Sequence, residues 1–223
     1  MKKLSLVLIM SIMLTSCLDD NHEKKSKCHQ VIIGNQEWNT ENLNVETFRN
    51  GDPIPWAITN EDWQEAGDRK QPAWCYYEND PKNEEKYGKL YNWYAVNDKR
   101  GLAPNGFHIP SDKEWQILID YLGGETDAAE KMKKTSYSVA HGWFFNSGKL
   151  TNISGFSGDY GFERYPDGTF MSLSGGDSYW WSSTENNSNN AWIRSISYNI
   201  WNNGIDRYDS DKKCGYSVRC IKD

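Results

Sequence analysis

Leu, Ile, Val and Phe are scarce in this chain and together account for only 40 of its 223 residues. That fraction lies near the level typical of disordered chains. The sequence compensates with 11 Trp and 13 Tyr, each of which buries roughly 150–250 Å² in a core. Positive charge is scarce too, because 25 Lys and Arg stand against 31 Asp and Glu, for a formal net charge of −6. We therefore expect an acidic domain with an aromatic core and no nucleic-acid partner, which would require clustered cations.

Long apolar runs are absent after the N-terminus, and none approaches the roughly 20 residues of a membrane-spanning helix. Lys2 and Lys3 precede an apolar segment over residues 4–14, which has the length of a signal-peptide core. The next residues, Leu14-Thr15-Ser16-Cys17, resemble the lipobox of bacterial lipoproteins. We expect residues 1–16 to be a lipoprotein signal peptide, with an uncleaved hydrophobic anchor as the alternative.

A lipidated Cys17 makes the membrane the first expected partner, because such a residue carries more than one acyl chain, as stable anchoring requires. Residues 17–28 are polar and lack periodicity, so they are predicted to form the lipidated Cys and a flexible tether. A single domain is expected over residues 29–223. Asp19-Asp20 resembles the surface-export signal of Bacteroidetes lipoproteins, or is simply a solvated part of the tether. The expected location is the outer membrane, with surface exposure or a periplasmic orientation left open.

Cysteine is sparse, with five residues and no Cys-x-x-Cys pair, and the four His are scattered. A zinc site is therefore not expected. With Cys17 set aside, the disulfide candidates are Cys28, Cys75, Cys214 and Cys220. An even number outside the cytosol permits two disulfides in three connectivities, and free buried thiols are the alternative.

Three segments have the pattern of helices. In residues 87–98, apolar and aromatic residues recur at i, i+3, i+4 and i+7. Residues 111–122 repeat this spacing, and Ser111 with Glu114 forms a capping box at their start. A short third helix is predicted over residues 127–134, which has lysines at the end that the helix dipole favours.

The remainder is predicted to form loops and strands. Residues 50–86 carry four prolines, so we expect loops and turns, pinned to the core by Trp56, Trp63 and Trp74. Strands are predicted over residues 31–33, 179–184, 191–200, 205–208 and 216–220. Hairpin turns are predicted at residues 165–169 and at Asn203-Gly204. One early strand, then helices, then many strands indicates an α+β domain.

Short motifs in a fixed order resemble the Fibrobacter succinogenes major paralogous domain family (FISUMP). They are GNQEW (34–38), ENL (41–43), YGKLYNWYA (87–95), PNGFHIPSDKEW (104–115), GFS (155–157), WWSSTE (180–185) and GYSVRC (215–220). The resemblance covers roughly residues 30–222. It implies a C-type lectin-like fold in the branch of the formylglycine-generating enzymes, with paired N- and C-terminal strands, two flanking helices and long loops on one face.

Catalysis is not expected from these residues. Formylglycine-generating enzymes bind copper with a cysteine pair near the C-terminus, but the residues around Cys214 and Cys220 do not match that motif. Hydrolase, zinc-protease and phosphate-loop motifs are also absent from the sequence. We expect a non-enzymatic protein without a cofactor, and a divergent enzyme of the formylglycine-generating type is the alternative.

The sequence offers weak candidate ligands for calcium. Asp206, Asp209 and Asp211 cluster after the predicted turn, and hard cations need several oxygen ligands. Because their spacing matches no EF-hand, they are weak candidates, and ordinary acidic turn residues are the simpler interpretation.

Aromatic and amide residues carry the main functional prediction. Aromatic faces stack on sugar rings or on peptide side chains, and amides hydrogen-bond to hydroxyls. The ligand-binding candidates are Trp181, Glu185, Asn186, Asn187, Asn190, Trp201, Asn202 and Asn203. The alternative is that the Trp residues fill the core and the Asn residues form turns. The sequence thus predicts a binding module for a glycan or an extracellular protein, with a structural or adhesin-type surface subunit as a further alternative.

Overall fold

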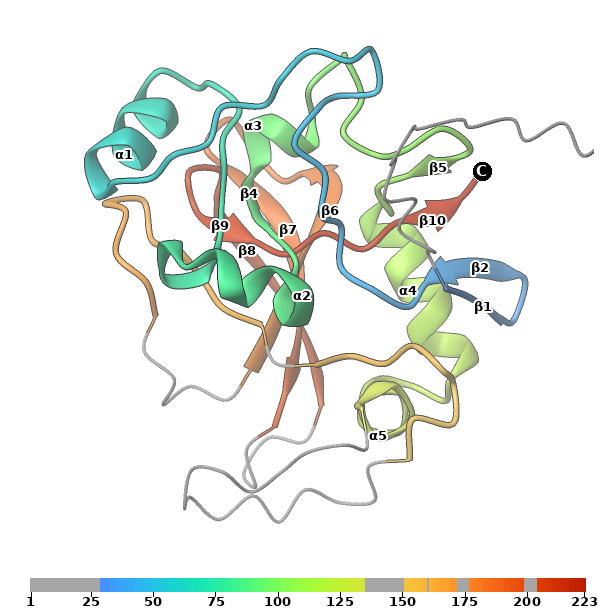
Figure 1. Ribbon diagram of the computed structural model, residues 1–223. Coiled ribbons are helices and arrows are strands. Elements are labelled where there is room, and N and C mark those ends of the chain that lie inside the picture. The colour runs from blue at the N-terminus through green and yellow to red at the C-terminus, as the bar shows by residue number, and fades with distance from the viewer. Residues whose placement is uncertain (1–28, 135–150, 160, 172–176, 199–203) are drawn as a thin grey trace, which may run out of the picture.

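The computed structural model describes residues 29–134, 151–159, 161–171, 177–198 and 204–223 (Figure 1). Its strands form three antiparallel sheets. The first has the order β1 (Gln30–Ile33), β2 (Gln36–Asn39), β10 (Ile221–Lys222) and β5 (Phe107–His108). The second has the order β3 (Trp74–Cys75), β4 (Leu90–Asn92) and β9 (Gly215–Tyr216). The third contains β6 (Asp177–Glu185), β7 (Asn190–Ser197) and β8 (Ile205–Asp211).

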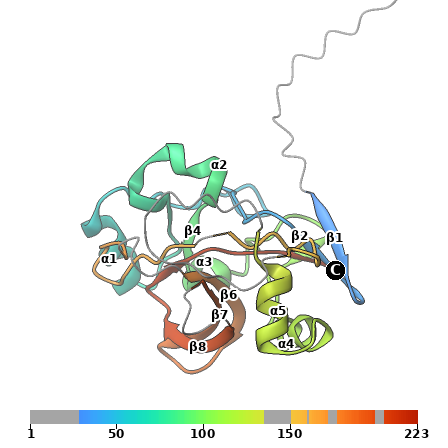
Figure 2. The same ribbon diagram turned by 90° about the horizontal axis from the view of Figure 1, so that it is seen from below.

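The described α-helices are α1 (Asn60–Asp68), α2 (Glu84–Tyr87), α3 (Trp93–Val96), α4 (Asp112–Tyr121) and α5 (Glu125–Met132). Two 3₁₀ turns, Tyr77–Asn79 and Pro81–Asn83, precede α2. Figure 2 shows α4 and α5 side by side, and α4 also packs against β6 and β7. Helices and antiparallel sheets are thus combined in an α+β fold, as predicted. In the part of the chain that the structure describes, every helix is too short or too polar to cross a bilayer.

The N-terminal and C-terminal strands meet in the first sheet, as predicted, but the C-terminal strand is β10, and the strand predicted over residues 216–220 is wrong beyond Tyr216. Trp38 of β2 pairs with Ile221 of β10, and Figure 1 places the C-terminus beside the β1–β2 hairpin. The predicted strands of the third sheet are also present, and Ile196 pairs with Ile205 across β7 and β8. The turn at residues 165–169 forms as well, because the N–H of Tyr165 donates to the carbonyl of Thr169 at 2.7 Å.

The predicted helices at 111–122 and 127–134 are confirmed as α4 and α5. At the start of α4, Ser111 Oγ accepts from the N–H of Glu114 at 3.2 Å, and Glu114 Oε2 accepts from the N–H of Ser111 at 2.8 Å. This reciprocal pair is the capping box that the sequence indicated. Helix α5 begins and ends two residues earlier than predicted.

The predicted helix over residues 87–98 is wrong in its middle. Helix α2 ends at Tyr87 because Gly88 has φ 70°, a conformation that glycine adopts without steric cost. Leu90–Asn92 then form β4, buried between β3 and β9. Helix α3 restarts where Asn92 accepts from the N–H of Ala95 at 3.1 Å. A helical spacing of apolar residues therefore also fits a short buried strand followed by one helical turn.

Helix α1 was not predicted, because residues 50–86 were expected to form loops. Thr59 caps its start, and Asp62 completes a capping box. Only Trp63 and Gly67 are buried on this helix, so its apolar stripe is too narrow to give a helical pattern.

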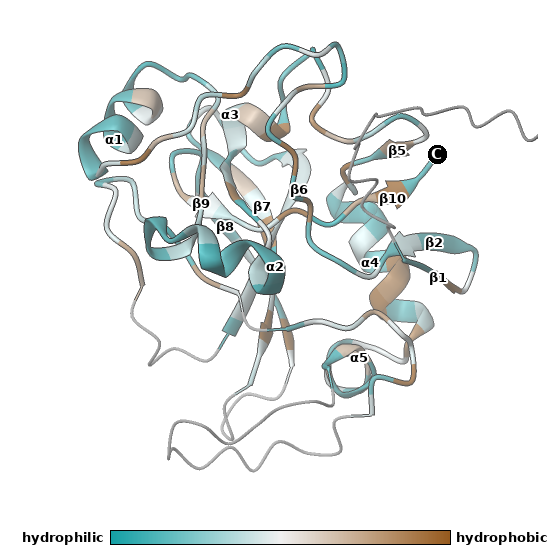
Figure 3. Cartoon of the chain, in the orientation of Figure 1, coloured by the Kyte–Doolittle hydropathy of each residue, from teal (hydrophilic) through white to brown (hydrophobic). Residues whose placement is uncertain are grey.

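Aromatic side chains fill the core, as the composition predicted. The largest fully buried residues include Trp38, Trp63, Trp115, Trp180 and Trp181. Trp38 and Trp115 pack with ring centroids 4.8 Å apart. Figure 3 shows hydrophilic residues along α1 and α2, hydrophobic residues on β10, and a largely pale β6. That strand is pale because its Ser, Trp and Tyr residues have intermediate hydropathy, although most of them are buried.

Candidate functional site

The loop between β6 and β7 is a tight turn that its own amides build. Asn187 Oδ1 accepts from the backbone N–H groups of Asn189 and Asn190 at 2.9 and 3.0 Å. The side-chain amides of Asn186 and Asn190 donate to Asp209 at 3.0 and 2.7 Å. These hydrogen bonds, led by that from Asn190, lower the pKa of the Asp209 carboxyl. The amides predicted to meet a ligand are therefore engaged within the turn.

A buried lysine supports this turn from below. Lys212, whose side chain is 4 % exposed, pairs with Glu185. Its Nζ donates to the carbonyls of Asn187 and Ser188 at 2.8 and 3.0 Å, and it lies 4.7 Å from the centroid of the Trp93 ring. Glu185 therefore serves here as the counter-charge of a buried cation.

The remaining predicted ligand-binding residues are a buried tryptophan and a group outside the described residues. Trp181 is 0 % exposed, and its Nε1 donates to the carbonyl of Tyr91 at 2.8 Å. Its assignment to a ligand surface is wrong, because no ligand reaches an indole in the core. Trp201, Asn202 and Asn203 lie outside the described residues.

The three calcium candidates do not converge on one point. They belong to β8, where successive side chains point to opposite faces. Asp206 is therefore on the other face from Asp209 and Asp211. Throughout the described segments, no group of three or more His, Cys, Asp or Glu side chains is placed to hold a metal ion.

The cysteines do not form the predicted disulfides among themselves. Within the described residues, no disulfide joins any two of Cys75, Cys214 and Cys220, and Cys28 lies outside them. Burial raises the pKa of the Cys75 thiol to about 11 and that of Cys214 to about 12, so both are poor nucleophiles. Cys214 lies directly before β9, and Cys220 lies directly before β10.

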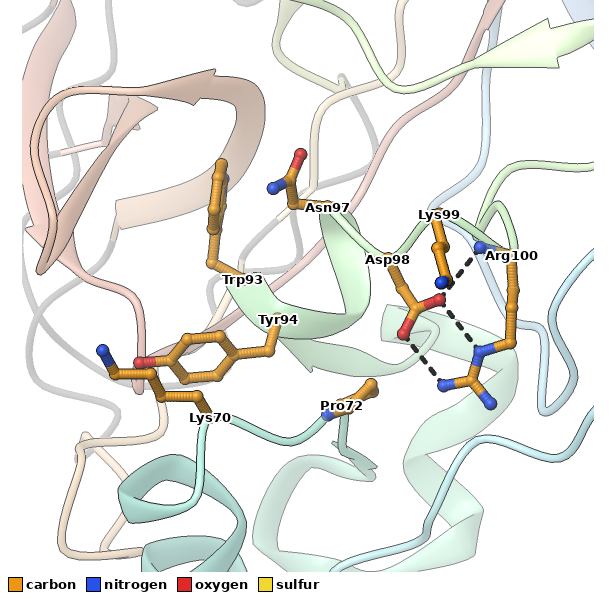
Figure 4. A pocket seen from close by; sticks show the side chains of 8 residues that line it. All are labelled: Lys70, Pro72, Trp93, Tyr94, Asn97, Asp98, Lys99 and Arg100. Atoms are coloured by element: carbon orange, nitrogen blue, oxygen red, sulfur yellow. Dashed lines mark hydrogen bonds and ion pairs between the residues drawn. The ribbon is translucent and has the colours of Figure 1, made fainter.

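A shallow pocket of about 490 Å³ opens beside α3 (Figure 4). Its lining residues are Lys70, Pro72, Trp93, Tyr94, Asn97, Asp98, Lys99 and Arg100. Figure 4 shows the Tyr94 ring on one side and the Asp98–Arg100 pair on the other. Asp98 accepts from Arg100 Nε and Nη2 at 2.9 and 2.8 Å. Because that pair is satisfied within the protein, the pocket offers a ligand one half-buried ring and flexible lysines.

A partly exposed indole beside β3 has a more rigid support. Trp63 and Trp74 are buried, and Trp56 packs on Trp74, as predicted for side chains that pin these loops to the core, although Trp56 remains 42 % exposed. Trp56 stacks on Trp74 with centroids 5.3 Å apart and an interplanar angle of 6°, and Tyr76 meets it edge-on at 5.6 Å. Backbone hydrogen bonds of 3.0 Å join Trp74 to the residues on both sides of Trp56. We call this unit of Trp56, Trp74 and Tyr76 the Trp56 platform.

A second buried lysine lies under the Trp56 platform. Lys89, with its side chain 1 % exposed, places its Nζ 4.7 and 5.0 Å from the rings of Trp74 and Tyr76. Its polar contacts are Asn44 Oδ1 at 2.6 Å, Glu84 Oε1 at 3.0 Å and Glu46 Oε1 at 3.3 Å. Both Asn44 and Glu84 also line the neighbouring cavity, so Lys89 connects the platform to it.

That cavity has a volume of about 670 Å³, and most of its lining residues have polar or charged side chains. They are residues 39–45, residues 84–86 of α2, and Gly88, Pro104, Lys134, Ser157, Asp159 and Arg219. We call it the polar cavity. Its size is within the range of small-molecule sites.

Two buried side chains stand out in the wall of the polar cavity. Arg219 is 2 % exposed, and its donors go to neutral acceptors: Asn42 Oδ1 and the carbonyls of Phe156 and Asn39. Burial lowers the pKa of Arg219 to about 10. Asn39 is 6 % exposed, and its Oδ1 has no hydrogen-bond partner among the described residues. The wall therefore holds a buried acceptor that a donor on a ligand would satisfy.

Sequence reasoning missed this site for two reasons. Trp56 was grouped with the core tryptophans, although the prolines at positions 53 and 55 beside it mark a loop position. The Asn- and Glu-rich run at 39–46 was used only as a family motif. Its alternation of amides and carboxylates was the available signal.

Comparison with known proteins identifies the family but gives no close relative. No curated protein and no solved structure matches the chain. The model of the Fibrobacter succinogenes major domain matches residues 31–222, nearly all of the described chain. The match agrees with the motifs, which extend from the β1–β2 hairpin to β10. The chain therefore belongs to the Fibrobacter succinogenes major domain family.

Proposed function

We propose that this protein is a lipid-anchored, non-enzymatic binding module of lectin-like architecture that captures a glycan outside the cytoplasm. The observation that carries the proposal is the exposed Trp56 indole, stacked at 5.3 Å on buried Trp74 next to the polar cavity. The pairing of β2 with β10 supports the lectin-like architecture.

The physical argument rests on pre-organisation. An aromatic face offers the apolar side of a sugar ring a large contact area, and a ring that is already fixed loses little entropy on binding. Trp56 is fixed by a parallel ring below it and by Tyr76 at its edge. The neighbouring cavity supplies carboxylate, amide and hydroxyl groups for the sugar hydroxyls.

The anchoring proposal rests on Leu14-Thr15-Ser16-Cys17. A tether over residues 18–28 would reach about 40 Å when fully extended, which leaves the domain free to meet a ligand beyond the lipid surface. Metabolic labelling with a palmitate analogue should mark the wild type and not Cys17→Ser. Equal labelling of the two proteins would refute the anchor.

A glycan array tests the binding function. The full chain, solubilised in a detergent without a sugar head group, should retain at least one glycan class. Trp56→Ala should reduce that signal at least tenfold, because the stacking face is lost, while the melting temperature changes little. Tyr94→Ala is the matched control, since it removes a half-buried ring from the other pocket, and it should leave the signal unchanged.

Two results would contradict the proposal. One is an array on which the folded protein retains no glycan. The other is a glycan signal that Trp56→Ala leaves intact. A signal lost in Tyr94→Ala but kept in Trp56→Ala would move the site to the pocket of Figure 4.

A further inference from the structure

The accessible charges around the Trp56 platform and the polar cavity are mainly carboxylates. Glu41, Glu46 and Glu85 are exposed, and the side chain of Glu84 is 40 % exposed. Two cations of this region are buried: Lys89 lies under the platform, and Arg219 lies in the cavity wall. A ligand therefore meets acidic groups first.

The accessible cations at this face are already engaged. Lys134 pairs with Asp159 at 3.1 Å, and Lys86 donates to Tyr87 Oη at 2.7 Å. Arg49, which approaches Pro104, donates to the carbonyls of Ala103 and Phe107 at 3.0 and 2.8 Å. Each of these three cations thus already has an acceptor within the protein, which lowers its attraction for an acidic ligand.

The hydrogen-bonding groups of the cavity favour the same kind of ligand as its charges do. Asn39 lines the polar cavity, and its Oδ1 has no partner in the described structure, so a ligand that carries donors suits this wall better than one that carries only acceptors. A protonated amine supplies three N–H donors and a positive charge. The exposed face of Trp56 attracts the same group, because a cation over an indole is stabilised by the ring quadrupole.

From these observations we propose that the ligand of the Trp56 platform and polar cavity is a glycan carrying protonated amino groups, that is, an amino-sugar chain that is not N-acylated. This inference rests on the proposed function, and it names the substrate class of the same site. The net charge of −6 favours such a ligand at long range and repels uronate chains.

Three oligosaccharides of equal length test this proposal by calorimetry on the full chain in the same detergent. They are a glucosamine oligomer, its fully N-acetylated form and an oligogalacturonate. The glucosamine oligomer should bind at least fivefold more tightly than the acetylated form at pH 6. The uronate should bind most weakly, and about 0.5 M salt should largely remove the preference, because it screens exposed charges.

Variants of two carboxylates in the cavity wall test whether these groups cause the preference for the amine. Glu41→Gln combined with Glu85→Gln should weaken binding of the glucosamine oligomer more than binding of the acetylated oligomer, and so reduce the preference for the amine at least threefold. Glu125→Gln on α5, an exposed carboxylate remote from the cavity walls, is the control and should preserve the preference.

Uronate binding as tight as that of the glucosamine oligomer would overturn this inference, and the proposed function would stand on the array result. Binding of the acetylated form alone would do the same. Failure of all three oligosaccharides also overturns the inference. The proposed function falls only if the array shows no glycan that depends on Trp56.

Discussion

In two regions of the molecule, a buried lysine packs on an indole ring and pairs with a glutamate, but the two lysines support different structures. Under the turn between β6 and β7, Lys212 lies 4.7 Å from the ring of Trp93, and under the platform Lys89 lies 4.7 Å from the ring of Trp74. Each lysine is almost fully buried and is neutralised by at least one partly exposed glutamate. Both sites combine a cation–π contact with an ion pair, which makes burial of an ammonium tolerable.

The difference lies in what each lysine binds besides carboxylates. Lys212 takes the backbone carbonyls of Asn187 and Ser188, so it closes a turn whose amides are already satisfied. Lys89 takes the side-chain oxygen of Asn44, a residue that lines the polar cavity together with Glu84. A run of amides is therefore no evidence of a ligand site until its internal hydrogen bonds are counted.

Removing the buried indole at either lysine should cause the largest loss of stability. Trp74→Ala and Trp93→Ala each remove a buried indole, and each should lower the free energy of unfolding by roughly 3–5 kcal/mol. Only Trp74→Ala should also abolish glycan capture, because Trp56 loses the ring on which it stacks. Denaturant titration and the array measure the two effects separately. If Trp74→Ala still captures the glycan at a temperature where the variant is folded, the platform does not differ from the β6–β7 turn in its role in binding.

Replacing either buried lysine should cause an intermediate loss of stability. Lys89→Met and Lys212→Met keep the side-chain volume and remove the buried cation. Each should cost about 1–3 kcal/mol, less than the usual penalty for breaking a buried pair, because the glutamates left behind are partly exposed and can be hydrated.

The readout of function distinguishes the two lysines. Lys89→Met should weaken glycan capture, since Asn44 and Glu84 lose their common donor. Lys212→Met should instead speed hydrogen exchange in the β6–β7 turn and leave capture unchanged. Identical effects of the two variants on capture would show that the regions are coupled.

Much of the fold could be predicted from local chemistry. The capping box at Ser111 gave α4, and the segments on either side of the predicted Asn203-Gly204 turn gave β7 and β8. Prediction failed where long-range contacts decide the structure. Leu90–Asn92 form a strand because β3 and β9 lie on either side, and no periodicity within the segment encodes that pairing.

The site was less predictable than the fold, because exposure depends on the whole chain. Trp56 and Trp181 look alike in sequence, but one is 42 % exposed and the other 0 %. The amides at 186, 187 and 190 were suited to a ligand by composition, and only the geometry shows that Asp209 and the backbone take them up. Lipidation of Cys17 remains a prediction from sequence.

The smallest expected effect concerns acid and the β6–β7 turn. The pKa of the Asp209 carboxyl is lowered because Asn190 and Asn186 donate to its ionised form. A carboxyl with a depressed folded-state pKa contributes its stabilisation above the unfolded pKa, and loses it as the pH falls through the folded value. The turn should therefore be unaffected near neutral pH and loosen only below the ordinary range of aspartate. NMR should show the side-chain amide signals of Asn186 and Asn190 shifting together with the Asp209 carboxyl carbon in one acid titration. In Asp209→Asn that coupled shift should disappear, and amide signals that still moved together would assign the acid response to another carboxyl group.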